Sequence, residues 1–86
     1  MRVEYSKTAA KALQRMDKVL RNRIRAGIEG LKCVPPKGDI KPMEGNPAGR
    51  YRLRVGGYRV IYRYDREQTM IVLFIIEIGS RGDVYK

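Results

Sequence analysis

The chain has no histidine and only one cysteine, Cys33, among its 86 residues. A lone cysteine cannot form an internal disulfide, and it cannot build a cysteine-based metal site. The lack of histidine excludes a pair of histidines acting as acid and base. Any catalysis must therefore rest on other side chains.

Carboxylates are scarce, and long apolar runs are missing. The nine acidic residues are scattered without the paired spacing of metal ligands, which argues against a two-metal nuclease and predicts no metal or cofactor. The longest apolar run, residues 70–76, is too short to cross a membrane. Residues 1–5 contain no apolar run that would serve as a secretion signal. We expect a cytoplasmic protein.

Positive charge is abundant. Lysine and arginine number 19 against 9 acidic residues, which gives a formal net charge of +10. Residues 1–49 hold 11 basic and 5 acidic residues, and residues 50–86 hold 8 and 4, so the excess belongs to the folded surface. It indicates an anionic partner, either nucleic acid or an acidic protein. The length predicts a single domain, residues 1–86, and the charge favours a monomer.

The first half of the chain predicts a strand followed by two helices. Residues 2–5 read as a short strand, and Ser6 and Asp17 are good N-caps for helices over residues 7–15 and 18 to about 33. Residues 34–49 hold all four prolines and are expected to form a loop. The residues expected to face the core are Ala9, Ala12, Leu13 and Met16, then Leu20, Ile24, Ile28 and Leu31, and, from the loop, Ile40 and Met43.

Residues 50–64 predict two strands joined by a tight turn at Gly56-Gly57. Alternation along the first strand, residues 50–55, places Arg50, Arg52 and Arg54 on one face. Arg59 joins that face from the second strand, residues 58–64. The opposite face carries Tyr51, Leu53 and Val55, and then Tyr58, Val60, Tyr62 and Tyr64. The tyrosines of the second strand could stack on RNA bases, but because they share a face with Val60 they read as core or sheet-edge packing.

The last strand completes the predicted fold. After a turn at residues 65–68, residues 69–78 are almost wholly apolar, which is typical of a central strand covered on both faces. The order β-α-α-β-β-β predicts an α+β fold, with a helical hairpin on one face of a mainly antiparallel four-stranded sheet. The last three strands form a meander, and residues 2–5 lie beside the last. The other face is then open and lined by Arg52, Arg54 and Arg59.

These motifs resemble the RelE-type toxins of the RelE/ParE superfamily, which belong to toxin–antitoxin modules. The resemblance covers nearly the whole length. Its carriers are Tyr51-Arg52-Leu53-Arg54-Val55-Gly56, Tyr58-Arg59-Val60-Ile61-Tyr62, the ending Gly79-Ser80-Arg81-Gly82-Asp83-Val84-Tyr85, the early Lys7-Thr8-Ala9-Ala10-Lys11 and the loop segment Ile40-Lys41-Pro42-Met43-Glu44-Gly45.

The resemblance implies an endoribonuclease that cuts mRNA in the ribosomal A site without a metal. In such toxins the 2′-hydroxyl attacks the adjacent phosphate, which leaves a 2′,3′-cyclic phosphate and a 5′-hydroxyl, and a cognate antitoxin blocks the toxin. The family's functional positions fall here on Arg52, Arg54, Arg59, Arg81 and Tyr85.

The four arginines of this set support the chemistry through charge rather than proton transfer. Arg59 and Arg81 are expected to clamp the phosphate, and Arg52 and Arg54 to lie near the attacking hydroxyl. Some relatives carry lysine at the positions of Arg52 and Arg54. Arginine stays protonated and cannot replace lysine as a base, which leaves Tyr85 as the obvious proton carrier. The alternative role of Tyr85 is to stack on a base of the RNA and orient it.

Further cations are candidates for RNA or rRNA contact. They are Arg50 on the arginine strand and Lys18, Arg21 and Arg25 on the second helix. The simpler alternative for the helical set is a solvated face. An acidic, amphipathic C-terminal region of the antitoxin is expected to pack on the helices or the sheet.

Two other functions stay open. The ParE branch of the superfamily poisons DNA gyrase, which would be protein inhibition without RNA cleavage. A non-catalytic module that binds RNA or the ribosome also fits the charge.

Overall fold

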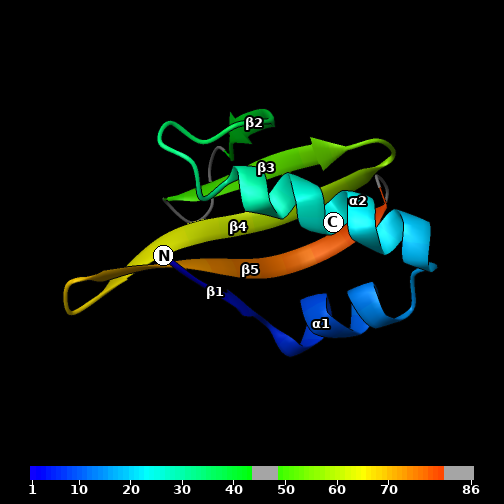
Figure 1. Ribbon diagram of the computed structural model, residues 1–86, viewed down its shortest axis with the longest axis horizontal. Helices are drawn as coiled ribbons and strands as arrows, with labels where there is room; N and C mark the ends of the chain where they lie inside the picture. Colours follow the sequence, from blue (N-terminus) through cyan, green and yellow to red (C-terminus); the bar gives the residue numbers. More distant parts are fainter. Residues whose placement is uncertain (44–48, 81–86) are drawn as a thin grey trace.

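Residues 1–43 and 49–80, the part of the chain that this computed structural model describes, form a five-stranded sheet with two helices on one face (Figure 1). The strands lie in the order β1-β5-β4-β3-β2. Strand β1 runs parallel to β5, and the other neighbouring pairs are antiparallel. The elements in chain order are β1 (Arg2–Tyr5), α1 (Lys7–Gln14), α2 (Lys18–Gly30), β2 (Asp39–Pro42), β3 (Arg50–Val55), β4 (Tyr58–Glu67) and β5 (Met70–Ser80). The α+β class and the meander are confirmed. Strand β5 is an interior strand, between β1 and β4, but the helices cover only one of the two faces that were expected to be covered.

Both helices begin at the predicted N-caps. The Asp17 side chain accepts a hydrogen bond from the backbone N–H of Leu20 at 2.8 Å. The Ser6 hydroxyl accepts one from the N–H of Ala9 at 3.0 Å and donates to the carbonyl of Ile76 at 2.6 Å. Ile76 is the extra residue of a bulge, because the register of β4 and β5 shifts between Ile61 and Tyr62. Ser6 therefore joins the start of α1 to strand β5.

The second helix ends three residues before the predicted boundary at Cys33. The N–H groups of Leu31, Lys32 and Cys33 each bond to the carbonyl three residues earlier, at 3.0 to 3.3 Å. This tighter winding closes the helix before Pro35 and Pro36.

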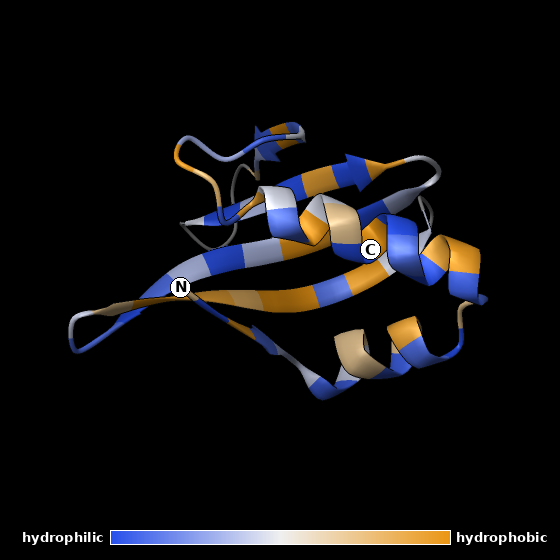
Figure 2. Ribbon diagram, in the orientation of Figure 1, coloured by the Kyte–Doolittle hydropathy of each residue, from blue (hydrophilic) through white to orange (hydrophobic). Residues whose placement is uncertain are grey.

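The core lies between the helices and the sheet, and it contains the predicted apolar faces of both helices (Figure 2). Tyr64 donates its hydroxyl hydrogen to the carbonyl of Leu31 at 2.7 Å, which ties the sheet to the end of α2. Tyr51 and Tyr62 stack at 5.6 Å between ring centroids, and the tyrosines are core packing as predicted. The fully buried members are Ala9, Ile24, Ile28, Leu31, Leu53, Val60, Tyr62, Leu73 and Ile75.

One strand was missing from the prediction. Strand β2 lies within residues 34–49, which were expected to form a loop, and it pairs with β3 so that Ile40 is opposite Leu53. Ile40 packs against the core as predicted, and Met43 is half-buried. Since β2 is an edge strand, Pro42 at its end is tolerated without an N–H for the ladder.

The predicted turn at residues 65–68 was also wrong. Strand β4 continues to Glu67, and the turn falls on Gln68 and Thr69, with Gln68 at a φ of 57°. The charged residues stay in the strand because they are paired: Asp65 accepts from Arg63 at 2.9 Å, and Glu67 from Arg2 at 2.9 Å.

Candidate functional site

Three of the predicted site residues meet on the sheet face opposite the helices. Strand alternation sends Leu53 and Val60 into the core, so Arg52, Arg54 and Arg59 project from the other face. The antiparallel register places Arg54 directly opposite Arg59. We call Arg52, Arg54 and Arg59 the arginine cluster.

The arginine cluster is more buried than the sequence indicated. An open face was expected, yet only 7% of Arg52 and 8% of Arg59 is accessible to solvent, and Arg54 alone is well exposed. The Nε atom of Arg52 is buried and has no hydrogen-bond partner among the described residues. Burying a guanidinium is costly unless an anion or hydrogen-bond acceptor compensates it, so these positions favour binding of an anionic group.

A carboxylate that the sequence analysis did not single out lies beside the cluster. Asp39 on β2 is paired in register with Arg54 and accepts a hydrogen bond from its Nε at 2.7 Å. Its other carboxylate oxygen lies 3.6 Å from Nη2 of Arg52. Three arginines and one carboxylate leave the site with a net positive charge. The available signal was the alternation Asp39-Ile40-Lys41, with its apolar residue pointing inward.

More cations extend the same face. Arg50 is opposite Arg63 and Lys41 is opposite Arg52 in the strand register. Arg63 is already engaged, because it pairs with Asp65 and lies 4.7 Å from the centroid of the Phe74 ring. Of the predicted RNA-binding residues, Arg50 is thus the one that lies next to the arginine cluster.

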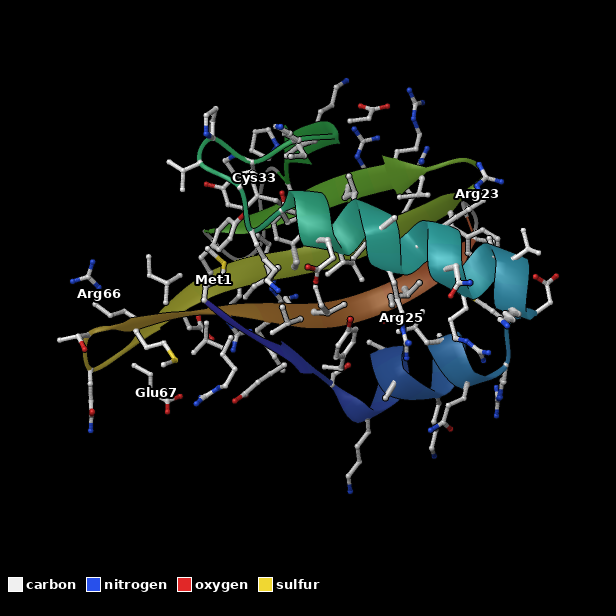
Figure 3. All side chains as sticks on the ribbon, viewed as in Figure 1. Met1, Arg23, Arg25, Cys33, Arg66 and Glu67 are labelled. Carbon is white, nitrogen blue, oxygen red and sulfur yellow. The ribbon has the colours of Figure 1, made fainter. Side chains whose placement is uncertain are left out.

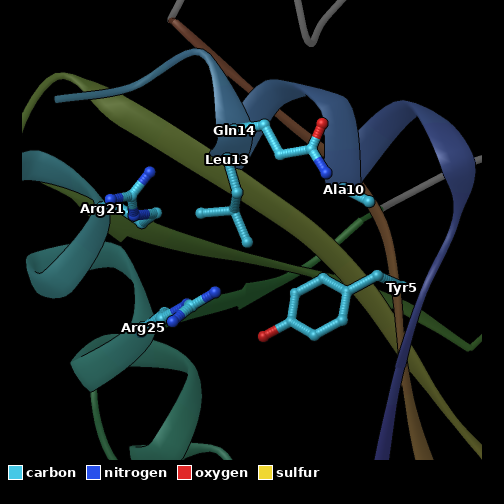
Figure 4. A pocket seen from close by; sticks show the side chains of 6 residues that line it. All are labelled: Tyr5, Ala10, Leu13, Gln14, Arg21 and Arg25. Carbon is cyan, nitrogen blue, oxygen red and sulfur yellow. The ribbon is translucent and has the colours of Figure 1, made fainter. Parts of the chain in front are cut away.

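The helical cations form a separate surface, because α2 covers the opposite face of the sheet (Figure 1). Arg21 and Arg25 line a cleft between α1 and α2 together with Tyr5 and Gln14 (Figure 4). Burial raises the pKa of Tyr5 above its ordinary value, although the nearby Arg25 opposes that shift. Lys18 lies at the start of α2. Because α2 covers the face opposite the arginine cluster, the structure does not bring Lys18, Arg21 or Arg25 to that cluster.

Arg23 is a second residue that the sequence analysis missed. It projects from α2 on the side away from Arg25 (Figure 3), and its Nη2 lies 3.4 Å from where a Cβ on Gly56 would be. Gly56 is in the turn that follows Arg54 and precedes Arg59, so Arg23 approaches the end of the cluster from the helical side.

The remaining predicted site residues, Arg81 and Tyr85, lie outside the described residues. The last described residue, Ser80, pairs with Tyr58, and Gly79 pairs with Arg59.

The described part of the chain contains no candidate metal site and no helix that could cross a membrane. Within residues 1–43 and 49–80, no group of three or more His, Cys, Asp or Glu side chains is placed to hold a metal ion. Neither helix in this part of the chain is long and apolar enough to cross a bilayer.

Known proteins share this fold. A YoeB/ParE toxin from Agrobacterium tumefaciens superposes with a TM-score of 0.80 over 94% of this chain and 99% of its own, at 22% identity, which is a likeness of fold. The toxin in an archaeal RelE–RelB complex from Pyrococcus horikoshii is 32% identical with a TM-score of 0.73, covering 95% of this chain and 96% of that one.

Sequence relatives agree with the structural ones. Toxin RelG from Mycobacterium tuberculosis is 39% identical over 46 residues, which are 54% of this chain and 51% of that protein. The match therefore spans about half of that relative's length. The family described as "ParE toxin of type II toxin-antitoxin system, parDE" matches residues 3–85. The chain therefore belongs to this family of toxins, within the RelE/ParE superfamily.

Proposed function

We propose that this toxin is a ribosome-dependent endoribonuclease that cuts mRNA in the A site without a metal ion. The observation that carries the proposal is the arginine cluster: three guanidiniums on one sheet face, two of them largely buried. Guanidinium groups bind phosphate oxygens through paired N–H donors, and they stabilise the extra negative charge of a pentavalent phosphorane. The low dielectric around buried donors strengthens that effect.

The reaction is an attack by the ribose 2′-oxygen on the adjacent phosphorus. The bond from phosphorus to the 5′-oxygen breaks, the attacking hydroxyl loses its proton, and the leaving oxygen gains one. In this proposal Arg59 and Arg81 clamp the phosphate, while Arg52 and Arg54 lie near the attacking hydroxyl. Tyr85 carries the proton, and holding the 2′-oxygen in line with the leaving group supplies several kcal/mol.

Other cations hold the RNA rather than react with it. Arg50 extends the arginine cluster along β3, and we assign it to the mRNA backbone. Lys18, Arg21 and Arg25 lie on the helical side, where we assign them to rRNA.

The cleavage assay tests the proposal on programmed ribosomes, with the cut site and the end groups mapped. Wild-type protein is expected to cut within the A-site codon and leave a 2′,3′-cyclic phosphate. Arg59→Lys keeps the positive charge but loses the planar pair of N–H donors that binds a phosphate bidentately. We therefore expect a cleavage rate about 10²-fold lower. Arg81→Ala tests the other half of the clamp. Arg66→Ala, at the far end of β4, is the matched control and is expected to keep the wild-type rate.

Ribosomes that keep intact mRNA while binding wild-type protein would contradict the nuclease and leave a non-catalytic binding module. Thermal unfolding of each variant separates loss of the fold from loss of chemistry.

A cognate antitoxin with an acidic segment is the proposed protein partner. Similar toxins from Pyrococcus horikoshii and Mycobacterium tuberculosis were solved in complexes with their antitoxins. A net charge of +10 attracts an acidic chain, and such attraction weakens as salt screens it. Affinity for the antitoxin should therefore fall as the salt concentration rises from about 0.1 M to about 0.5 M, measured by calorimetry. Salt-insensitive binding would overturn the electrostatic part.

Inhibition of DNA gyrase is a second candidate, because the matching family is described by the ParE toxin. A supercoiling assay with purified gyrase decides this point. Inhibition of supercoiling together with uncut mRNA would favour the second candidate.

A further inference from the structure

Asp39 contacts two members of the arginine cluster from the neighbouring edge strand. Its carboxylate accepts from Arg54 Nε at 2.7 Å, lies 2.6 Å from Nη2 of the same side chain, and lies 3.6 Å from Nη2 of Arg52. We propose that Asp39 is a positioning residue that fixes these two guanidiniums for a phosphate of the RNA. This inference rests on the proposed nuclease function.

The contact leaves part of Arg54 available. Nε and Nη2 form one edge of the guanidinium, and both face the same oxygen of Asp39. The other edge, Nη1 with the second hydrogen of Nη2, has no partner among the described residues. That edge has the paired geometry that binds a phosphate. Asp39 therefore binds one edge of the Arg54 guanidinium and leaves the other edge available to a phosphate.

Repulsion within the cluster explains why a carboxylate is needed there. Arg52 and Arg54 are alternate residues of β3, so they share a face about 7 Å apart, and Arg59 is directly opposite Arg54. Like charges opposite one another in a sheet repel. Arg54 is half exposed, and without Asp39 its side chain would turn toward solvent. The carboxylate holds it over the strand pair.

Asp65 provides a matched control. It is also a strand carboxylate that accepts from an arginine Nε, that of Arg63 at 2.9 Å, but it lies on β4 and contacts no member of the cluster. Asp39→Asn and Asp65→Asn each remove one negative charge; the first removes the ion pairs with Arg54 and Arg52, and the second removes the ion pair with Arg63. A difference between these variants therefore reports the place of the carboxylate rather than the net charge.

The experiment compares both variants with wild type by single-turnover cleavage on programmed ribosomes and by affinity for a 2′-O-methyl RNA that cannot be cut. We expect Asp39→Asn to cleave about tenfold more slowly, with an RNA affinity equal to that of Asp65→Asn. Asp65→Asn is expected to cleave at the wild-type rate. Asp39→Glu restores the carboxylate and should recover part of the loss.

A readout independent of cleavage is the exchange of the arginine Nε–H protons, measured by NMR. The Arg54 signal should exchange slowly in wild type and in Asp65→Asn, and quickly in Asp39→Asn. Faster cleavage by Asp39→Asn would instead make Asp39 a competitor of the phosphate. Equal slowing in both variants would show a general charge effect. Either result overturns the proposal.

Failure of the proposed function is distinguishable from failure of this inference. If wild type leaves mRNA intact, the nuclease proposal is wrong, and Asp39 is then judged by the NMR signal. Equal exchange of Arg54 in wild type and Asp39→Asn overturns the contact itself.

Discussion

Tyr64 shows how a single side chain connects the two layers. Its hydroxyl reaches the carbonyl of Leu31 just after the end of α2, while its ring packs edge-on against Tyr62 at 5.6 Å. The carbonyl of Leu31 lies beyond the last residue of the helix, where backbone acceptors lack an intrahelical donor. The Tyr64 hydroxyl thereby supplies a hydrogen-bond donor to a backbone carbonyl that has none within the helix.

Tyr64→Phe is expected to lower the free energy of unfolding by about 1 kcal/mol, because it removes this hydrogen bond and keeps the ring. Tyr51→Phe is the control in the same ring cluster, since no hydrogen bond of its hydroxyl is formed among the described residues. Urea unfolding of both variants measures the difference. Equal losses would mean that the ring contacts, and not the hydroxyl of Tyr64, account for the effect.

At the scale of elements, Ser6 couples α1 to the bulge of β5. The hydroxyl accepts at the helix start and donates to the carbonyl of Ile76, which the bulge takes out of the regular ladder. Asp17 caps α2 in the same way but makes no such second contact among the described residues. The two caps therefore differ in one hydrogen bond.

Ser6→Ala should lower the free energy of unfolding by about 2 kcal/mol, against about 1 kcal/mol for Asp17→Ala. Ser6→Asp separates the two roles, because a carboxylate still accepts from Ala9 and cannot donate to Ile76. Chemical denaturation of the three variants gives the comparison. A loss no greater for Ser6→Ala than for Asp17→Ala would show that the contact with the bulge adds nothing.

Local pattern predicted most elements, and what it missed depends on contacts between distant residues. The caps and strand β3 are specified by neighbouring residues, and they lie where the sequence placed them. Strand β2 has one core-facing residue, Ile40, between prolines and glycines, so it is a strand only because β3 lies beside it. Alternation likewise predicted the face of the arginine cluster, but not its burial or its contact with Asp39, which is 15 residues from Arg54.

At the scale of the whole molecule, the core tyrosines Tyr62 and Tyr64 limit the stability of the fold at alkaline pH. Burial raises the pKa of Tyr62 and of Tyr64 above the ordinary value of 10.0. The folded protein therefore keeps these protons to a higher pH than the unfolded chain does. The stability that they contribute is complete below pH 10.0, and it is lost as the pH rises through the folded-state pKa values.

The free energy of unfolding should thus fall as the pH rises above about 10, and phenolate absorbance should appear together with unfolding. Tyr62→Phe removes the more deeply buried of the two phenols and should make this fall less steep. Circular dichroism and ultraviolet absorbance recorded on the same samples test both points. Ionisation of all tyrosines in a chain that stays folded would contradict the prediction.

The parallel pairing of β1 with β5 has a consequence for synthesis of the chain. Ser6 and Ile76, which bond where these strands meet, are 70 residues apart, and β5 is the strand against which α1 packs. A nascent chain that has emerged only as far as β4 lacks the strand that lies between β1 and β4. Contacts over such separations form late. The chain can therefore complete this fold only after β5 has left the exit tunnel, and a fragment that ends at β4 lacks the strand that joins β1 and α1 to the rest of the sheet.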